Sequence, residues 1–331
     1  MNVTNFTSVN PTDIVSVDFK AFAASRQIAR AAHMPGGVPD YSFGVDRQLR
    51  TNLTAIPALR SIAQMIVRSH EPLMQQMHLM DGIAVGPDQF PEIFRMGERC
   101  AERLGIGMPR IFILNQGAAN AWTYASDDAR PSIVITTLLR RYLNDEELTA
   151  VIGHECGHIH NLHSAYNTLV ELTSNLAASR MLSAAAGAGA PIGLLLKAVS
   201  LLGQGIRLAM LQWSRAAEIT CDRAGAICVG GVRPMMTALA KLKTGGEGGL
   251  SDVNLEAYVR QLDQVRGTPV KLMELFQSHP MTQKRIAALA AFEDSETYRA
   301  WLPAVEASQS PRSRQEVERR CVELVKVMGR G

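Results

Sequence analysis

Two histidines and a glutamate in this chain stand at a spacing that suits metal-dependent hydrolysis. His154 and His158 are four residues apart, and Glu155 follows the first of them. Residues 145–153 favour a helix, and on a helix residues four apart share one face. The two imidazoles could therefore bind one zinc ion while Glu155 reaches a water at an open coordination position. The alternative is a polar helix with surface histidines.

A metal site of this kind needs a third ligand from elsewhere in the chain. On a helix, His160 points about 160° away from His158, and His163 also falls off the metal-facing line. Glu218 and Asp222 are four residues apart, so their carboxylates share a helical face. One could bind the metal, and the other could hold a ligand histidine by its far ring nitrogen. A solvated acidic face paired with neighbouring arginines is the alternative.

The segments before the two histidines predict a small sheet followed directly by the metal-site helix. Short apolar or aromatic runs predict strands at residues 110–114, 120–124 and 132–136. Asn144 is expected to cap the next helix, with Glu147 completing a capping box. An edge strand beside a metal site can pair with an extended peptide, and residues 120–124 are the candidate for it. An internal core strand is the equal alternative.

The rest of the chain predicts helices around this sheet, a mainly α (α+β) fold. Aromatic residues make up only 5% of the 331 residues, while Ala, Leu, Ile and Met are plentiful, which favours a helical core. Further helices are expected at residues 18–32, 46–70 with a break at 57, 91–104, 234–243, 254–265, 270–277, 282–292 and 316–328.

Composition excludes several classes of protein. Hydrophobic residues at 47% and charged residues at 20% are typical of a folded globular chain. The net charge of +3 is too small to indicate nucleic acid as a partner. The first ten residues lack a basic run followed by an apolar run, so we expect no secretory signal. The odd number of cysteines, without C-x-x-C spacing, favours a reducing compartment and a cytoplasmic chain: Cys100, Cys156, Cys221, Cys228 and Cys321.

Taken together, these motifs resemble the glutamate-zincin (gluzincin) metallopeptidases. Within them, the chain resembles the HtpX-like and CAAX-prenyl-endopeptidase family, the forty-eighth metallopeptidase family. The resemblance covers about residues 90–292 and rests on several stretches in the family's order. These are Asn-Ala-Trp at 120–122 for the family's Asn-Ala-Phe/Tyr edge segment, the L-x-x-x-E-L-x-x-V-x-x-H-E-x-G-H-I-x-x-x-H run at 143–163, E-x-x-x-D at 218–222 after Ser-Arg, and Ser-His-Pro at 278–280 ahead of Arg-Ile at 285–286.

The resemblance implies a role for each matching residue. It implies one zinc ion bound by His154, His158 and Glu218. Glu155 is implied as the general base, and Asp222 as the partner of a ligand histidine.

The resemblance also bears on His279, on the edge segment and on Cys221. His279 is implied as a catalytic contact near the metal or as an extra, inhibitory ligand, with a helix-capping histidine as the alternative. The edge segment, Asn120, Ala121 and Trp122, is implied to bind substrate. Cys221 stands where small or aliphatic residues are commoner in the family, and we expect it, like Cys156, to be a small core residue.

The sequence predicts three parts: an N-terminal helical segment (1–89), a catalytic domain (90–292) with a helical hairpin at about 181–213, and a C-terminal helical tail (293–331). In some members of the family, membrane helices surround the catalytic domain. Here the uncharged run 181–196 is 16 residues long, whereas a membrane span needs about 20. We therefore expect no membrane span. Peripheral membrane contact through the hairpin is the alternative.

The expected function is that of a zinc-dependent endopeptidase acting on proteins or peptides. Glu155 would take a proton from the zinc-bound water and pass it to the leaving amine. A rival expectation is a zinc-stabilised, latent or non-catalytic chaperone-like module. Its site would be closed by His279 or by the Gly-rich loop at 244–249. Hydrolysis of a non-peptide amide would use the same chemistry.

Overall fold

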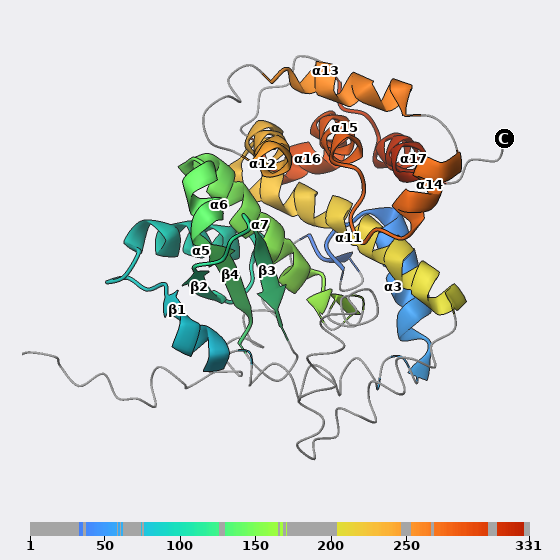
Figure 1. The fold of residues 1–331 in the computed structure, drawn as a ribbon. Helices are drawn as coiled ribbons and strands as arrows, with labels where there is room; N and C mark the ends of the chain where they lie inside the picture. The colour runs from blue at the N-terminus through green and yellow to red at the C-terminus, as the bar shows by residue number, and fades with distance from the viewer. Residues whose placement is uncertain are drawn as a thin grey trace, which may run out of the picture.

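A computed structural model of the chain shows a mainly helical molecule with one small sheet (Figure 1). It describes residues 33–35, 38–57, 59, 61, 74, 76–125, 130–164, 166–167, 170, 204–245, 253–265, 268–303 and 310–327. The expected α+β fold, with helices around a small sheet that precedes the His154–His158 helix, is confirmed. The helix expected at residues 18–32 lies outside the described residues, as does most of the Gly-rich loop.

The sheet has four strands in the order β1-β2-β4-β3. They are β1 (Gly82–Ala84), β2 (Arg110–Leu114), β3 (Ala121–Tyr124) and β4 (Ser132–Thr136). Strands β2 and β4 run parallel, and β1 and β3 pair antiparallel on either side of them. All five residues of β4 are buried, as befits a strand with a neighbour on each side. Strand β3 lies at an edge of the described sheet. It is therefore an edge strand, as the sequence allowed, and not an internal core strand.

The helix that carries the two histidines is α7 (Asp145–His160), and it begins where the sequence predicts. Asn144 Oδ1 accepts from the backbone N–H of Glu147 at 2.9 Å, and Glu147 Oε2 accepts from that of Asn144 at 2.9 Å. This is the expected capping box. Lys241 adds a 2.6 Å ion pair to the same Glu147 oxygen. The start of the helix is therefore fixed by three polar contacts.

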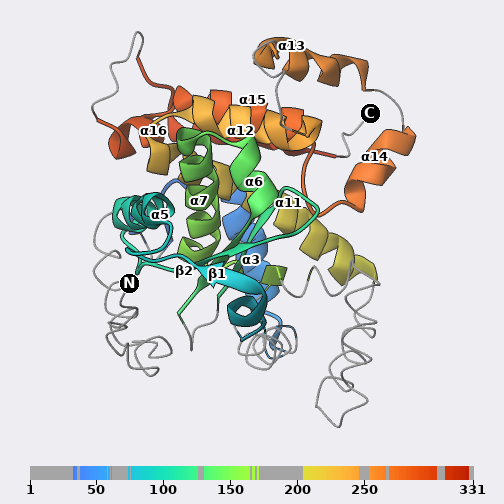
Figure 2. The ribbon, with the colours of Figure 1, turned by 60° about the vertical axis from the view of Figure 1, so that its left-hand side comes forward.

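Helix α7 lies in the middle of the molecule, against the sheet on one side and against α11 (Gln204–Val229) and its neighbours on the other (Figures 1 and 2). Two glycines allow α11 to come close. A Cβ on Gly153 would lie 2.6 Å from Cβ of Cys228, and one on Gly157 would lie 2.8 Å from Cβ of Ala224. The glycines thus let α11 approach α7 closely, and the neighbouring histidines project toward Glu218 of α11.

Helix α11 is 26 residues long and includes the end of the expected hairpin. Residues 204–213 are its first turns and continue without a break through Glu218 and Asp222. Residues 181–203, the remainder of the hairpin, lie outside the described residues. Among the helices that the structure describes, none combines the length and apolar character needed to cross a bilayer.

The other predicted helices that the structure describes lie within a few residues of their expected positions. In the region expected to be helical at 46–70, α3 ends at Thr54, ahead of the break expected at Pro57, and residues 62–70 lie outside the described residues. The remaining elements are α3 (Gly44–Thr54), α5 (Pro91–Leu104), α6 (Thr137–Tyr142), α12 (Val232–Thr244), α13 (Leu255–Arg260), the 3₁₀ turn η3 (Gln261–Gln264), α14 (Thr268–Leu275), α15 (Thr282–Glu293), α16 (Glu296–Trp301) and α17 (Arg314–Val325).

Segments from both ends of the chain pack on α11 around Arg223, which is 2% exposed. Its guanidinium donates to the backbone oxygen of Tyr41 at 3.0 Å and to Oε1 of Glu318 at 2.7 Å. It also lies over the rings of Phe43 and Phe292. One buried cation thus joins the segment before α3, α15 and α17. The division of the chain at residues 89 and 292 stays a prediction.

Candidate metal centre

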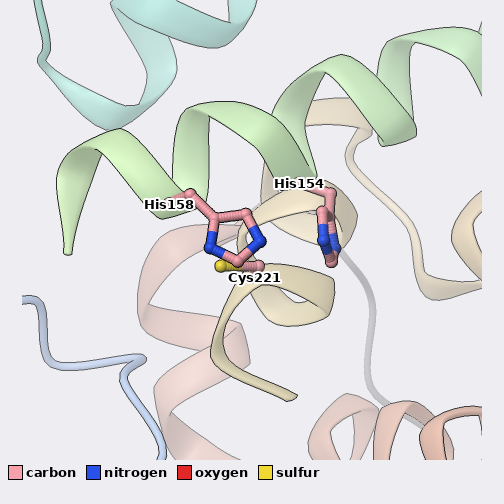
Figure 3. A group of neighbouring side chains, drawn as sticks. All are labelled: His154, His158 and Cys221. Carbon is pink, nitrogen blue, oxygen red and sulfur yellow. The ribbon is translucent and has the colours of Figure 1, made fainter. Parts of the chain in front are cut away.

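The two histidines of α7 and Glu218 of α11 face one another. Nε2 of His154 lies 3.8 Å from Oε2 of Glu218, and Nε2 of His158 lies 3.5 Å from Oε1. All three residues are at most 5% exposed. Figure 3 shows both imidazoles leaving the same face of α7 toward α11. The histidine pair and the carboxylate that the sequence singled out therefore form a candidate metal site.

Cys221, also on α11, is a competing donor. One ligand atom each from His154, His158 and Cys221 lie within 4.8 Å of one another, and Figure 3 shows the thiol beside His158. Burial, then the nearby carboxylate of Glu218, raises the pKa of this thiol well above its usual range. Burial alone would also raise the pKa of Glu218, but the charges of His279 and Arg285 outweigh it and hold that pKa well below its usual range. Without a metal, the carboxylate is therefore the donor that needs no loss of a proton before it can bind one.

Asp222 lies behind His154, as expected of the second carboxylate. Its Oδ1 is 3.0 Å from Nδ1 of His154. Burial alone would lower the pKa of His154, but the hydrogen bond to Asp222 and the charge of Glu218 outweigh it and raise that pKa. With Nδ1 held by a carboxylate, the Nε2 of this histidine faces the candidate site.

Arg285 of α15 neutralises both carboxylates. Its Nε and Nη2 donate to the two oxygens of Asp222 at 2.8 and 2.6 Å, and its Nη1 lies 2.9 Å from Oε2 of Glu218. Burial alone would lower the pKa of Arg285, but Asp222 and Glu218 raise it. Two buried carboxylates close together are tolerated here because a buried guanidinium joins them.

Glu155, the expected base, receives a hydrogen bond from the edge strand. Thr123 Oγ1 donates to Glu155 Oε2 at 2.6 Å. Glu155 is 6% exposed. In β3 alternate residues face opposite sides, and the side that carries Thr123 also carries Ala121. Trp122 points the other way and packs on the far face of the sheet, against the cluster around Phe112.

His279 lies at the rim of the site. Its Nδ1 is 2.9 Å from Oε2 of Glu218, and its side chain is 64% exposed. The Glu218 carboxylate raises the pKa of His279, and the partial loss of solvent around its ring acts in the opposite direction. The same Glu218 oxygen thus contacts His279 and Arg285.

A cleft of about 210 Å³ joins these groups. Its walls come from the edge strand, α7, α11, α12 and the segment around His279. The predicted site residues that line it are Asn120, Ala121, Trp122, His154, Glu155, His158, Glu218 and His279. Asp222 lies behind this surface, against His154.

Sequence reasoning missed the support of His158. Its Nδ1 lies 3.2 Å from Nδ1 of His163, whose Nε2 lies 3.2 Å from Oδ2 of Asp46. A helical projection places His163 off the metal-facing line, but α7 ends at His160, and Leu162 takes a left-handed φ of 58°. The chain therefore turns back and brings His163 beneath His158. The hydroxyl of Thr123 was missed too, although the two-residue period of a strand could have indicated it.

Residues 87–293 match the sequence profile of peptidase family M48. The chain belongs to this family. The resemblance to HtpX-like peptidases is therefore confirmed. The members of family M48 are zinc metalloendopeptidases.

Individual relatives are distant. The plastoglobule-localized metallopeptidase 48, chloroplastic, of Arabidopsis thaliana is 25% identical over 272 residues, which cover 80% of this chain and 75% of the relative. A protease HtpX homolog of Ralstonia nicotianae is 27% identical over 63% of this chain and 77% of its own length. Another, from Thermoplasma volcanium, is 31% identical over 63% of this chain and 73% of its own length.

A solved structure is also similar. The crystal structure of S. mikatae Ste24p matches with a TM-score of 0.40 and 16% identity. The match covers 82% of this chain and 66% of the Ste24p chain, a little under two thirds of it.

Proposed function

We propose that this chain is a zinc-dependent endopeptidase that hydrolyses peptide bonds in proteins or peptides. The observation that carries the proposal is the convergence of His154, His158 and Glu218 at one end of a cleft whose wall also holds Glu155. Family membership supports the reaction class. The assignment of each residue to a role is part of the proposal.

The donor set fits zinc. Two imidazole nitrogens and one carboxylate are a common catalytic combination for this ion, and they leave a fourth position open. The Nδ1 atom of each histidine contacts a group behind it, Asp222 or His163, so the Nε2 atoms are the ones that face Glu218. His154, His158 and Glu218 would hold the ion. The chemistry that zinc would supply is polarisation of a peptide carbonyl and a lowered pKa for a water molecule.

Proton transfer falls to Glu155. Its carboxylate would accept the proton of the attacking water and later give it to the leaving amine nitrogen. The hydrogen bond from Thr123 fixes one carboxylate oxygen and leaves the other for this task. His279, exposed at the rim, would donate to the oxyanion that develops on the former carbonyl oxygen.

The substrate would bind as an extended strand. In the described sheet, β3 pairs with β4 on one side only, and its residues line the cleft. Backbone groups of Asn120, Ala121 and Trp122 would hydrogen-bond the substrate backbone, which favours an unfolded or extended protein segment. The side chain of Trp122 packs on the other face of the sheet, so any contribution from this residue would come from its backbone.

The second candidate, a latent or non-catalytic zinc module, draws support from one observation. Oε2 of Glu218 lies 2.9 Å from both His279 and Arg285, so groups other than a metal contact the third ligand in this arrangement. If these contacts persist with zinc bound, the site would be closed. The intact pair of Glu155 and Thr123 favours catalysis.

We also propose a cytoplasmic location. All five cysteines are free and buried, which suits a reducing compartment. Peripheral membrane contact through residues 181–213 stays a prediction, as does the absence of a nucleic-acid partner.

Cleavage of unfolded casein by the purified chain tests the proposal. We expect cleavage that a chelator abolishes and added zinc restores. A Glu155→Gln variant should bind zinc as the wild type does but lose activity by about 10²- to 10⁴-fold, the usual contribution of a general base. The exposed Glu146, changed to Gln on the same helix, is the control and should stay active. A zinc-loaded wild type that cleaves nothing would favour the latent module, and an active Glu155→Gln variant would refute the base.

A further inference from the structure

The two histidines of the proposed metal site are supported in different ways. A carboxylate contacts His154 directly, since its Nδ1 lies 3.0 Å from Oδ1 of Asp222. Nδ1 of His158 instead lies 3.2 Å from Nδ1 of His163. The far nitrogen of His163, Nε2, lies 3.2 Å from Oδ2 of Asp46. A carboxylate therefore stands behind each histidine, in one case through a second imidazole.

Asp46 is held as a hydrogen-bond acceptor. It is fully buried, as is His163. Trp213 Nε1 donates to its Oδ1 at 2.9 Å, and Thr220 Oγ1 donates to its Oδ2 at 2.7 Å. An indole N–H can only donate, and an ionised carboxylate can only accept. The contact between Asp46 and His163 is therefore a hydrogen bond donated by the imidazole.

The direction of this hydrogen bond determines the direction of the next one, between His163 and His158. If Nε2 of a neutral His163 carries the proton, its Nδ1 offers a lone pair. That lone pair accepts the N–H of His158 Nδ1. The Nε2 of His158 is then left with a lone pair directed at Glu218, 3.5 Å away. A metal needs this tautomer, because only a nitrogen without a proton can coordinate it.

Glu218, 3.5 Å from Nε2 of His158, favours a proton on that nitrogen when no metal is bound, and the hydrogen bonds that start at Asp46 oppose it. Two further groups contact the Nδ1 atoms, and neither decides the tautomer. Asn167 Nδ2 lies 3.1 Å from Nδ1 of His158, but an amide can present either its oxygen or its nitrogen. The thiol of Cys221 lies 3.5 Å from Nδ1 of His163 and can donate or accept. Asp46 is the member of the network whose role is fixed.

We propose that Asp46 is a positioning residue of the metal centre, which acts through His163 to hold His158 in the tautomer that binds zinc. This inference rests on the proposed zinc site at His154, His158 and Glu218. It also gives the N-terminal segment a function, because Asp46 lies in α3, well before the matched region 87–293.

Neighbouring residues of the N-terminal segment hold the same end of α7. Tyr41 Oη lies 2.9 Å from Nδ1 of His160, and Asn161 Nδ2 donates to that oxygen at 3.0 Å. Arg50 donates to the backbone oxygen of Asn161. The segment therefore fixes the position of the turn that carries His163, in addition to supplying its carboxylate.

An Asp46→Asn variant tests the proposal because it reverses the chain of hydrogen bonds with almost no change of shape. Trp213 can only donate, so the new amide oxygen should remain toward the indole and the NH₂ should face His163. His163 would then accept at Nε2 and donate from Nδ1 to His158. The proton of His158 would move to Nε2, where it blocks the metal.

Two matched variants serve as controls. His163→Gln should preserve the series of hydrogen bonds, since its amide can accept from His158 and donate to Asp46. Asp40→Asn makes the same change in another aspartate that contacts a tryptophan and a histidine: Trp301 Nε1 donates to it at 2.6 Å, and His33 Nδ1 lies 3.0 Å away. His33 does not contact a proposed ligand, so Asp40→Asn should leave the site unchanged.

Two readouts decide the outcome. In metal-free protein, the ¹⁵N shifts of the ring nitrogens should show His158 protonated at Nδ1 in the wild type, His163→Gln and Asp40→Asn, and at Nε2 in Asp46→Asn. Zinc affinity from chelator competition should fall about 10- to 100-fold in Asp46→Asn alone. If that variant does not fold, His163→Leu should show the loss that His163→Gln avoids. An unchanged His158 tautomer and zinc affinity in a folded Asp46→Asn variant would overturn the proposal. A wild type that binds no zinc would instead count against the proposed function, because the tautomer is read without metal.

Discussion

Thr123 Oγ1 lies 2.6 Å from Oε2 of Glu155, so the edge strand of the sheet and the proposed base are joined by one hydrogen bond. The same strand is the proposed docking edge for the substrate backbone. A peptide paired with β3 would therefore lie at a fixed distance from the Glu155 carboxylate. This coupling would give β3 both of its proposed functions, substrate binding and orientation of the base.

Replacement of Thr123 by Val should lower kcat with little change in zinc affinity. A hydrogen bond to a charged group contributes ~1.5–3 kcal/mol, which corresponds to about a 10- to 150-fold loss if it is needed to orient Glu155. Thr123→Ser keeps the hydroxyl and should recover most of the activity. Steady-state kinetics on a quenched-fluorescence peptide gives both parameters. Equal kcat values for the Val variant and the wild type would show that Glu155 needs no such support.

Loss of the imidazole at position 279 separates the two candidate functions. If His279 stabilises the oxyanion, His279→Ala should lower kcat by about 10²- to 10³-fold while the zinc content stays at one ion per chain. We expect this result, because the ring is exposed at the rim of the cleft. Gln277→Ala, an exposed change nearby, is the control. Faster cleavage by His279→Ala would instead identify the histidine as a block on Glu218.

Ionisation of Asp46 should make the free energy of unfolding depend on pH. Burial alone would raise the pKa of Asp46, but the electrostatic interaction and hydrogen bond with His163, the hydrogen bond from Thr220 and the charge of Arg50 outweigh it and lower that pKa. A carboxylate with a lowered native pKa stabilises the fold above its unfolded pKa of about 4, and this stabilisation is lost as pH falls through the native value.

Urea unfolding of metal-free wild type and Asp46→Asn from pH 7 to pH 3 measures this effect. The difference in unfolding free energy between the two should stay constant down to about pH 5 and shrink below about pH 4. A difference that is the same at pH 3 as at pH 7 would show that folding does not lower the pKa of Asp46.

The parts of the fold that depend on local sequence could be predicted. The cap formed by Asn144 and Glu147 follows from a short-range pattern, and the strands at 110–114 and 132–136 follow from apolar runs between turns. Strand β1 could not be predicted, because three residues, Gly82–Ala84, carry no periodic pattern. It exists because β2 offers an edge for it to pair with.

The residues of the candidate site also fall into those that the sequence could predict and those that it could not. His154, Glu155 and His158 follow from helical spacing, and Glu218 with Asp222 from spacing together with the family resemblance. Asp46 was out of reach, since its contact with His163 spans 117 positions and depends on the packing of α3 against α11. The approach of the Cys221 thiol to the histidines could not be foreseen either, because it depends on how closely the glycines of α7 let α11 approach.

Zinc content per chain, measured in parallel for wild type, Glu218→Ala and Cys221→Ala, tests the central assignment most directly. We expect one zinc in the wild type, much weaker binding in Glu218→Ala, and unchanged binding in Cys221→Ala, because in our proposal the ionised carboxylate and not the protonated thiol completes the site. Zinc that is retained by Glu218→Ala and lost by Cys221→Ala would contradict the assignment and make the thiol the third ligand.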